Sequence, residues 1–268
     1  RVEDDALRAE LSALDEVRDA AQIEDRFYRD LAFGTGGLRG VLGAGTNRMN
    51  VYVVRRATQG LAAYLKAAGL PLRCAIAYDS RIGSARFARE TARVLAANGV
   101  TAYLYPRLEP TPALSWAVRY YGCGAGVCVT ASHNPAAYNG YKVYWEDGAQ
   151  LPPKHADQVA KKMKELDVFA GVKTTPYDQA VAQGKITIMG QETDEAFLSH
   201  VMAQVNDRAA VEKVADTFKM VYTPFHGTGY KLIPEALRRL GMKHVICVPE
   251  QMVIDGNFPT VVSPNPEN

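Results

Sequence analysis

The residues best suited to chemistry in this sequence are Ser132 and His133, which lie in the segment TASHNP at residues 130–135. A serine hydroxyl that follows an apolar, strand-like run (residues 126–129) is placed to carry a phosphoryl group. Neighbouring side chains on an extended chain point to opposite sides, so His133 need not be the general base for Ser132. A serine hydrolase is disfavoured, because the two glycines of the G-x-S-x-G elbow are missing. The plain alternative is a loop serine that caps a turn.

A second candidate is the glycine-dense stretch FGTGGLRG at residues 33–40. Its glycines let backbone N–H groups approach an anion, and Arg39 adds a positively charged fork that suits phosphate. The stretch is not a Walker loop, which needs G-K-[ST]. It is not a dinucleotide fingerprint either, because Arg39 takes the place of the last glycine. The alternative is a flexible turn without a ligand.

Three further polar residues are candidates for the same site: Arg81 and His226, which follow strand-like runs, and Lys142, which lies on one. Lys142 comes soon after the serine segment, and its alternative role is that of a solvated strand lysine. Arg81 is expected to brace the serine loop, to contact a phosphorylated serine, or to form a structural ion pair with Asp79. For His226, a core or hinge position is at least as well supported as a ligand contact.

The elements that must position these side chains alternate between strands and helices. Apolar runs occupy residues 74–78, 100–105 and 126–129, and helical patterns occupy residues 84–98 and 111–121. Thr111 and Pro112 suit a helix start. This order predicts an α/β fold with a mixed, mainly parallel sheet flanked by helices. Ligands of such sheets bind at the carboxyl ends of strands, which is where Asp79, Arg81 and Ser132 fall.

The remaining segments predict two domains. Residues 1–189 form the first, with one or two amphipathic helices in residues 4–31, an apolar run at residues 51–54 before a helical pattern at residues 56–68, a turn at Asn139-Gly140, a strand at residues 141–145 and a helix at residues 152–166. Residues 190–268 form a second, partial α/β domain with helices at residues 192–205 and 230–240 and strands at residues 218–222 and 244–248.

Composition limits the function classes. The 268 residues contain 31 Lys plus Arg and 29 Asp plus Glu, a net charge of +2 that does not favour nucleic-acid or membrane-surface binding. The four cysteines form no CxxC pair, so we expect a reduced, cytoplasmic protein. No run approaches the roughly 20 apolar residues of a membrane span. Oligomeric state cannot be predicted from these features.

The segment TASHNP resembles the active-site signature of the α-D-phosphohexomutases, and residues 32–50 and 222–229 resemble other motifs of that family. The resemblance implies that Ser132 carries a phosphoryl group and transfers it between two hydroxyls of a sugar through a 1,6-bisphosphate. It also implies that Arg39 and Lys142 stabilise charge and move protons, and that His133 binds or orients the substrate phosphate. Four other residues are expected to bind phosphate: Thr35, Gly36, Arg81 and Asn134.

The resemblance further implies a Mg²⁺ ion held by phosphorylated Ser132 and by a D-x-D-x-D-R loop, with glucose 1,6-bisphosphate as activator. This sequence has no such loop, although residues 255–266 resemble the stretch that leads to it. Because the chain also starts without methionine, we expect a fragment of a larger enzyme that lacks its metal loop and two further domains. Such a fragment is expected to be inactive alone.

The stretch at residues 33–50 resembles the phosphoglucomutase and phosphopentomutase branch more than other phosphohexomutases, so glucose 1-phosphate is the leading sugar-phosphate substrate. A phosphomannomutase or a phosphopentomutase is the alternative within the same chemistry. The alternative from a different function class is a non-catalytic module that binds a sugar phosphate or a partner without turnover.

Overall fold

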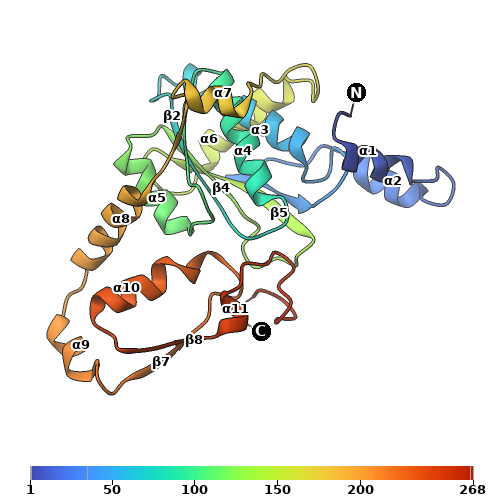
Figure 1. Ribbon diagram of the computed structural model, residues 1–268. Coiled ribbons are helices and arrows are strands. Elements are labelled where there is room, and N and C mark those ends of the chain that lie inside the picture. The colour runs from blue at the N-terminus through green and yellow to red at the C-terminus, as the bar shows by residue number, and fades with distance from the viewer. Residues whose placement is uncertain (1, 35, 266, 268) are drawn as a thin grey trace.

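The computed structural model describes residues 2–34, 36–265 and 267, and it shows two α/β units of unequal size (Figure 1). The large unit contains a six-stranded sheet, and the small unit contains a two-stranded sheet. Helix α8 (Gln191–Ala203) leads from one unit to the other. None of the described helices is both long enough and apolar enough to span a membrane.

The sheet of the large unit has the strand order β1-β5-β4-β2-β3-β6. Its strands are β1 (Gly37–Val41), β2 (Arg73–Tyr78), β3 (Thr101–Leu104), β4 (Ala125–Val129), β5 (Tyr138–Trp145) and β6 (Ile186–Ile188). Strands β4, β2, β3 and β6 are parallel, whereas β5 is antiparallel to both β4 and β1. The predicted mixed, mainly parallel sheet is confirmed.

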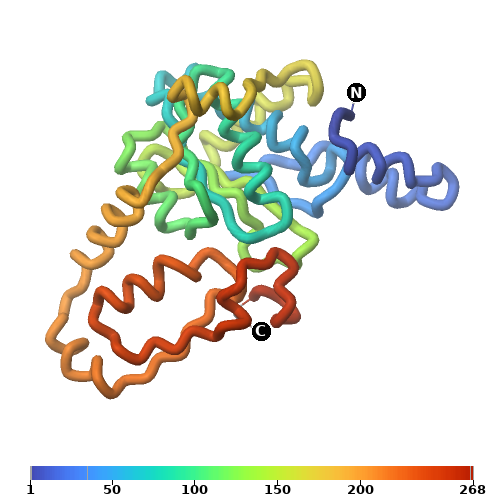
Figure 2. Tube along the Cα trace, viewed as in Figure 1, coloured from blue at the N-terminus to red at the C-terminus, as the bar shows by residue number. Residues whose placement is uncertain are grey.

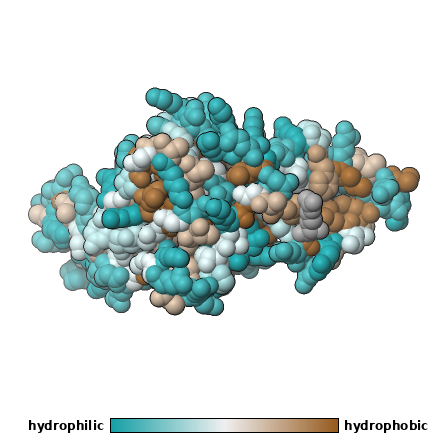
Figure 3. Space-filling view, turned by 90° about the horizontal axis from the view of Figure 1, so that it is seen from above, coloured by the Kyte–Doolittle hydropathy of each residue, from teal (hydrophilic) through white to brown (hydrophobic). Residues whose placement is uncertain are grey.

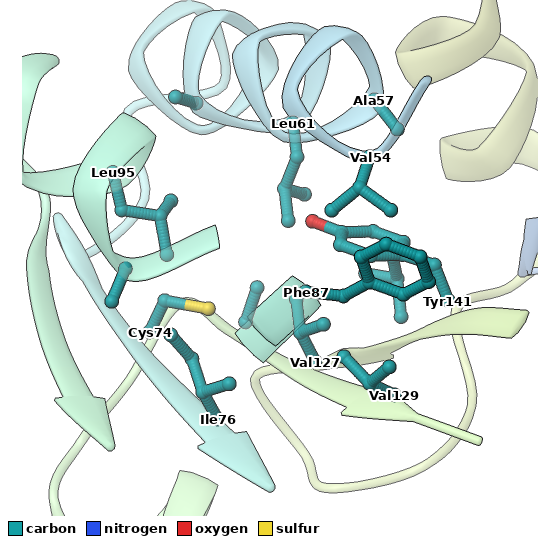
Figure 4. Close-up of a cluster of buried hydrophobic side chains, with 14 of the residues drawn as sticks. Val54, Ala57, Leu61, Cys74, Ile76, Phe87, Leu95, Val127, Val129 and Tyr141 are labelled. Atoms are coloured by element: carbon teal, nitrogen blue, oxygen red, sulfur yellow. The ribbon is translucent and has the colours of Figure 1, made fainter. Parts of the chain in front are cut away.

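Helices cover both faces of this sheet. One face packs against α3 (Val51–Ala67), α4 (Ser84–Ala97), α6 (Pro153–Lys164) and α7 (Tyr177–Ala182), and the other packs against α5 (Thr111–Tyr120) and α8. Figure 4 shows Val54 and Leu61 of α3 pointing toward Val127 and Tyr141 of the sheet. Strand β4 is buried along its whole length, as the centre of a three-layer core must be.

The apolar run at residues 51–54 is the first turn of α3 rather than a separate element. The side chain of Asn50 accepts hydrogen bonds from the N–H groups of Tyr52 and Val53, both at 3.1 Å, and so caps the helix. An asparagine cap satisfies backbone donors that have no partner within the helix. The cap therefore fixes the start of α3 at Val51.

The turn expected at Asn139-Gly140 is wrong, because both residues lie inside β5. Asn139 pairs with Gly40 and Gly140 pairs with Arg39 in the ladder to β1. A Cβ atom on Gly140 would lie 2.5 Å from the Thr130 carbonyl oxygen. The glycine thus permits close strand packing instead of a turn, and it brings β1, within the glycine-dense stretch, next to the strand of Lys142.

The first helices, α1 (Asp5–Ser12) and α2 (Ala20–Phe27), pack beside residues 43–47 at one end of the large unit. Glu10 of α1 pairs with Arg26 of α2 and accepts a hydrogen bond from the Ala44 N–H at 3.0 Å. Apolar residues gather at this end of the molecule (Figure 3) and line a groove of about 410 Å³. This groove lies between the first helices and the rest of the large unit, and none of its lining residues belongs to the serine loop.

The small unit pairs β7 (Lys219–Tyr222) and β8 (His244–Cys247) in parallel. Its helices are α9 (Arg208–Val214), α10 (Leu232–Leu240) and α11 (Pro249–Met252), with a 3-10 turn at Thr228–Tyr230. The predicted strands and α10 are present, whereas α9 and α11 were not predicted. The chain then returns toward the large unit, as the red segment of Figure 2 shows. The domain boundary near Gly190 stays a prediction.

Candidate active site

Ser132 lies in the loop that follows β4, at the carboxyl end of the central strand. The residue is exposed and adopts a positive φ of 56°, a conformation that is strained for a non-glycine residue. Its N–H donates to the Thr130 Oγ1 at 2.9 Å, and its Oγ lies 3.4 Å from the His133 Nδ1. A hydroxyl held outward on a constrained loop is well placed to accept or donate a group.

Arg81 holds this loop from behind. Its Nη1 donates to the carbonyl oxygens of Pro135 and Tyr138 at 2.9 and 3.1 Å, and its Nη2 donates to those of Ser132, at 2.9 Å, and Asn134. The Arg81 side chain is fully buried. This position favours the loop-bracing alternative over direct phosphate binding, because both Nη atoms are engaged by main-chain carbonyls.

Asp79 is the counter-ion of this arginine. Its Oδ2 lies 3.5 Å from the Arg81 Nε, and its Oδ1 accepts hydrogen bonds from the Arg81 N–H at 3.0 Å and from the Ser84 hydroxyl at 2.7 Å. Burial lowers the pKa of Arg81, and the nearby carboxylate of Asp79 opposes that effect. Arg81 therefore forms the predicted ion pair with Asp79 and braces the loop at the same time.

A cleft of about 450 Å³ separates the serine loop from the small unit. The loops at the carboxyl ends of β2 and β4 face the small unit in Figure 1. The large unit lines the cleft with Asp79, Ser80, Glu109, Thr111, Cys128, Thr130, Ser132, His133 and Lys142. The small unit lines it mainly with residues 222–229, together with Ile233, Phe258 and Pro264. The sequence motifs at residues 130–135 and 222–229 thus face one another.

Lys142 reaches the cleft from β5, where it is the register partner of Cys128 on β4 and of Gly37 on β1. The side chain is half-buried. Burial lowers the pKa of Lys142, and the positive charge of nearby Arg39 lowers it further. A lysine with a lowered pKa can stabilise phosphoryl charge and can also exchange a proton.

Arg39 lies on β1 opposite Gly140 and is exposed. Its charge is close enough to affect the pKa values of both Lys142 and Arg81, so Arg39 is a third cation near these two. Gly36 is buried with φ 77°, and its carbonyl oxygen accepts from the Val143 N–H at 2.7 Å. Gly36 therefore anchors the glycine-dense stretch to β5. Thr35, the other predicted phosphate ligand there, lies outside the described residues.

Asn134 and His226 have mainly structural contacts. The Asn134 N–H donates to the Ala131 carbonyl oxygen at 3.1 Å, and its buried Oδ1 has no hydrogen-bond partner. His226 is 1% exposed, with its Nδ1 2.8 Å from the Val253 carbonyl oxygen and its Nε2 2.7 Å from the Thr260 Oγ1. His226 therefore has the core position that the sequence left open.

Glu109 is a cleft residue that the sequence analysis missed. It is 1% exposed, and its Oε1 lies 3.0 Å from the Arg107 Nη2. Burial raises the pKa of Glu109 to about 7, and the negative charge of Asp194 adds to the effect. The available signal was its position between a strand and the Thr111 helix start, at the same edge of the sheet as Ser132.

The described residues do not by themselves fit a bound metal ion. Residues 2–34, 36–265 and 267 contain no group of three or more His, Cys, Asp or Glu side chains arranged to hold one. Of the two carboxylates that line the cleft, Asp79 is already engaged by Arg81 and Ser84. We therefore assign no step to a metal.

Comparisons with known proteins agree with this architecture. Residues 30–168 match the family described as phosphoglucomutase/phosphomannomutase, alpha/beta/alpha domain I, and residues 195–268 match its domain II. A phosphoglucomutase of Staphylococcus saprophyticus is 36% identical over 238 residues, which are 89% of this chain and 42% of the relative. A phosphoribomutase of Saccharomyces cerevisiae is 36% identical in an alignment of 273 positions that covers 96% of this chain and 43% of the relative.

Solved structures share the fold. A provisionally assigned phosphomannomutase of Thermus thermophilus aligns with a TM-score of 0.71 and 23% identity, over 87% of this chain and 48% of that one. The chain spans less than half the length of the curated relatives named above. Because the matches to both family domains together cover most of its residues, the chain belongs to the phosphoglucomutase/phosphomannomutase family, the α-D-phosphohexomutases.

Proposed function

We propose that the protein containing this chain is a phosphoglucomutase-type isomerase that moves a phosphoryl group between two hydroxyls of one sugar through Ser132. The observation that carries the proposal is the exposed Ser132 hydroxyl, on a loop braced by buried Arg81, in one cleft with Lys142. Phosphoryl transfer depends chiefly on positioning and on neutralising charge. The braced loop supplies the positioning, and the nearby cations neutralise the charge.

In the proposed step, an oxygen of a sugar hydroxyl attacks the phosphorus of phosphorylated Ser132. A new P–O bond forms as the bond to the Ser132 Oγ breaks, and the hydroxyl proton passes through a basic side chain to the departing Oγ. The lowered pKa of Lys142 makes its amine the proposed carrier of this proton. Arg39 is proposed to stabilise phosphoryl charge, and exposed His133 to orient the phosphate group. After the bisphosphate intermediate reorients in the site, its other phosphoryl group is transferred back to Ser132.

Glucose 1-phosphate is the proposed substrate, because the curated relatives include phosphoglucomutases at up to 36% identity. Phosphoribomutases match equally well, which supports a pentose phosphate as the second candidate. Mg²⁺, bound in part by phosphorylated Ser132, glucose 1,6-bisphosphate as activator and a cytoplasmic location belong to the proposal on the strength of the resemblance and of the free cysteines.

The test is a turnover assay on the full-length protein with Mg²⁺ and a trace of glucose 1,6-bisphosphate. Conversion of glucose 1-phosphate, ribose 1-phosphate and mannose 1-phosphate is followed by phosphorus NMR. We expect conversion by the parent protein and none by Ser132→Ala. Ser199→Ala, on the exposed surface of α8, is the matched control and retains activity. Turnover by Ser132→Ala, or no turnover of any sugar phosphate by the parent, would refute the proposal.

A further inference from the structure

The small unit touches the large unit directly behind the serine loop. Gly256 packs so closely on the segment that contains Arg81 that an added Cβ atom would lie 2.6 Å from the Ser80 carbonyl oxygen and 2.7 Å from the Ile82 N. Such distances leave no room for any side chain other than hydrogen. The loop at residues 255–260 is therefore docked on the backbone that carries Arg81.

Phe258 is the side chain that this docking places against Arg81. Its ring centroid lies 5.2 Å from the Arg81 Cζ, within the range of a cation–π contact. The residue is 6% exposed and has a φ of 54°, which is an unusual conformation for an aromatic residue. A buried ring held in a strained backbone position indicates that its neighbours fix it in place.

The loop at residues 255–260 is tied firmly to the small unit. The Asn257 N–H donates to the Asp255 Oδ1 at 2.8 Å, which closes the turn that precedes Phe258. His226 binds Thr260 through Nε2 at 2.7 Å and the Val253 carbonyl oxygen through Nδ1 at 2.8 Å. The position of Phe258 therefore follows the position of the small unit.

Arg81 connects this ring to the serine. The guanidinium contacts Phe258 and also donates hydrogen bonds to the carbonyl oxygens of Ser132 and Asn134. Because the Arg81 side chain is fully buried, the ring also keeps water away from those hydrogen bonds. Ser132 keeps its positive φ only while such contacts hold the loop.

We propose that Phe258 is a positioning residue through which the small unit, acting on Arg81, holds the serine loop in the conformation that presents the Ser132 hydroxyl. Its link to phosphoryl transfer rests on the proposed function of Ser132. The claim that Phe258 orders the serine loop does not depend on that function, because it concerns the loop before any phosphoryl group is attached. Movement of the small unit then changes the order of the serine loop through Phe258 and Arg81.

The first test measures amide hydrogen exchange by mass spectrometry in the unphosphorylated chain, for peptides that cover residues 130–138. We expect faster exchange there in Phe258→Ala and in Phe258→Leu, and a return to parent exchange in Phe258→Tyr, which keeps the ring face. Phe258→Leu preserves apolar packing, so it reports on the ring even where Phe258→Ala unfolds the small unit. Phe218→Ala, at a half-exposed phenylalanine on the same unit, is the matched control and leaves the loop unchanged.

Unchanged exchange at residues 130–138 in Phe258→Leu would overturn the proposal, and so would faster exchange that Phe218→Ala shows equally. In the full-length protein we expect Phe258→Leu to lower kcat about thirtyfold, the size of a desolvated cation–π contact, with little change in KM. Equal losses in Phe258→Leu and Phe258→Tyr would also contradict a role for the ring. If Ser132 is never phosphorylated, the proposed function fails while the exchange result still stands or falls by itself.

Discussion

Replacing Glu109 by glutamine tests the electrostatics of the cleft. Burial and the charge of Asp194 raise the pKa of Glu109 from 4.5 to about 7, so the folded state binds a proton there more tightly than the unfolded chain. Arg107 and Lys231 oppose this effect, and Tyr105 and Tyr230 face the same cluster. The stability that this proton supplies is complete below pH 4.5 and is lost as the pH rises through 7.

The magnitude follows from the same pKa values. A gap of about 2.5 pH units, at about 1.4 kcal/mol per unit, gives about 3 kcal/mol of unfolding free energy lost by the parent between pH 4.5 and pH 8. Glu109→Gln has the same shape and carries no charge at any of these pH values. The unfolding free energy of the variant minus that of the parent should therefore rise by about 3 kcal/mol over this range.

The assay is urea unfolding of both chains at several pH values, followed by tryptophan fluorescence. Both tryptophans, Trp116 and Trp145, lie in the large unit, so the signal reports the unit that contains Glu109. Asp194→Asn should weaken the pH dependence in the parent, because it removes a negative charge and frees Arg107 and Lys231 for Glu109. A stability difference that stays constant with pH, or that falls as the pH rises, would refute the reasoning.

Three further substitutions test the packing of the site by urea unfolding. Gly140→Ala should destabilise the chain by about 3 kcal/mol, because its Cβ would lie 2.5 and 2.9 Å from two carbonyl oxygens. The control Gly99→Ala, with open space around it, should cost about 1 kcal/mol. Equal costs for the two variants would contradict the close strand packing at Gly140. Arg81→Ala should cost about 3–5 kcal/mol, because it removes the donor from four main-chain carbonyl oxygens and leaves the Asp79 carboxylate without its counter-ion; a loss below about 1 kcal/mol would argue against the brace. Tyr141→Phe should cost about 1 kcal/mol through its 3.0 Å hydrogen bond with Thr58, and the double variant with Thr58→Val should cost less than the sum of the two single variants.

The strand and helix alternation of the large unit could be predicted because its signals are local. The apolar run that contains β3 lies between Gly99 and Pro106, and α5 begins at Thr111-Pro112 as its sequence indicates. The position of Ser132 at the carboxyl edge of the sheet follows from the same alternation. Local patterns therefore gave the order of elements and the edge at which the site lies.

The rest depends on contacts between residues that are distant in sequence. Asn139-Gly140 has the local signature of a turn, yet pairing with β1 about a hundred residues earlier keeps it extended. Strand β1 was not predicted, because it lies in a glycine-dense stretch whose local preference is for turns. The contact of Phe258 with Arg81 and the charge cluster around Glu109 arise between units, and no periodicity in the sequence records either of them.

The central claim is that Ser132 carries the phosphoryl group, and intact-mass and peptide mass spectrometry of the full-length protein test it most directly. After incubation with glucose 1,6-bisphosphate and Mg²⁺, we predict the addition of one phosphoryl group, located on Ser132 and absent from Ser132→Ala. No added phosphoryl group, or the same addition in Ser132→Ala, would contradict the account.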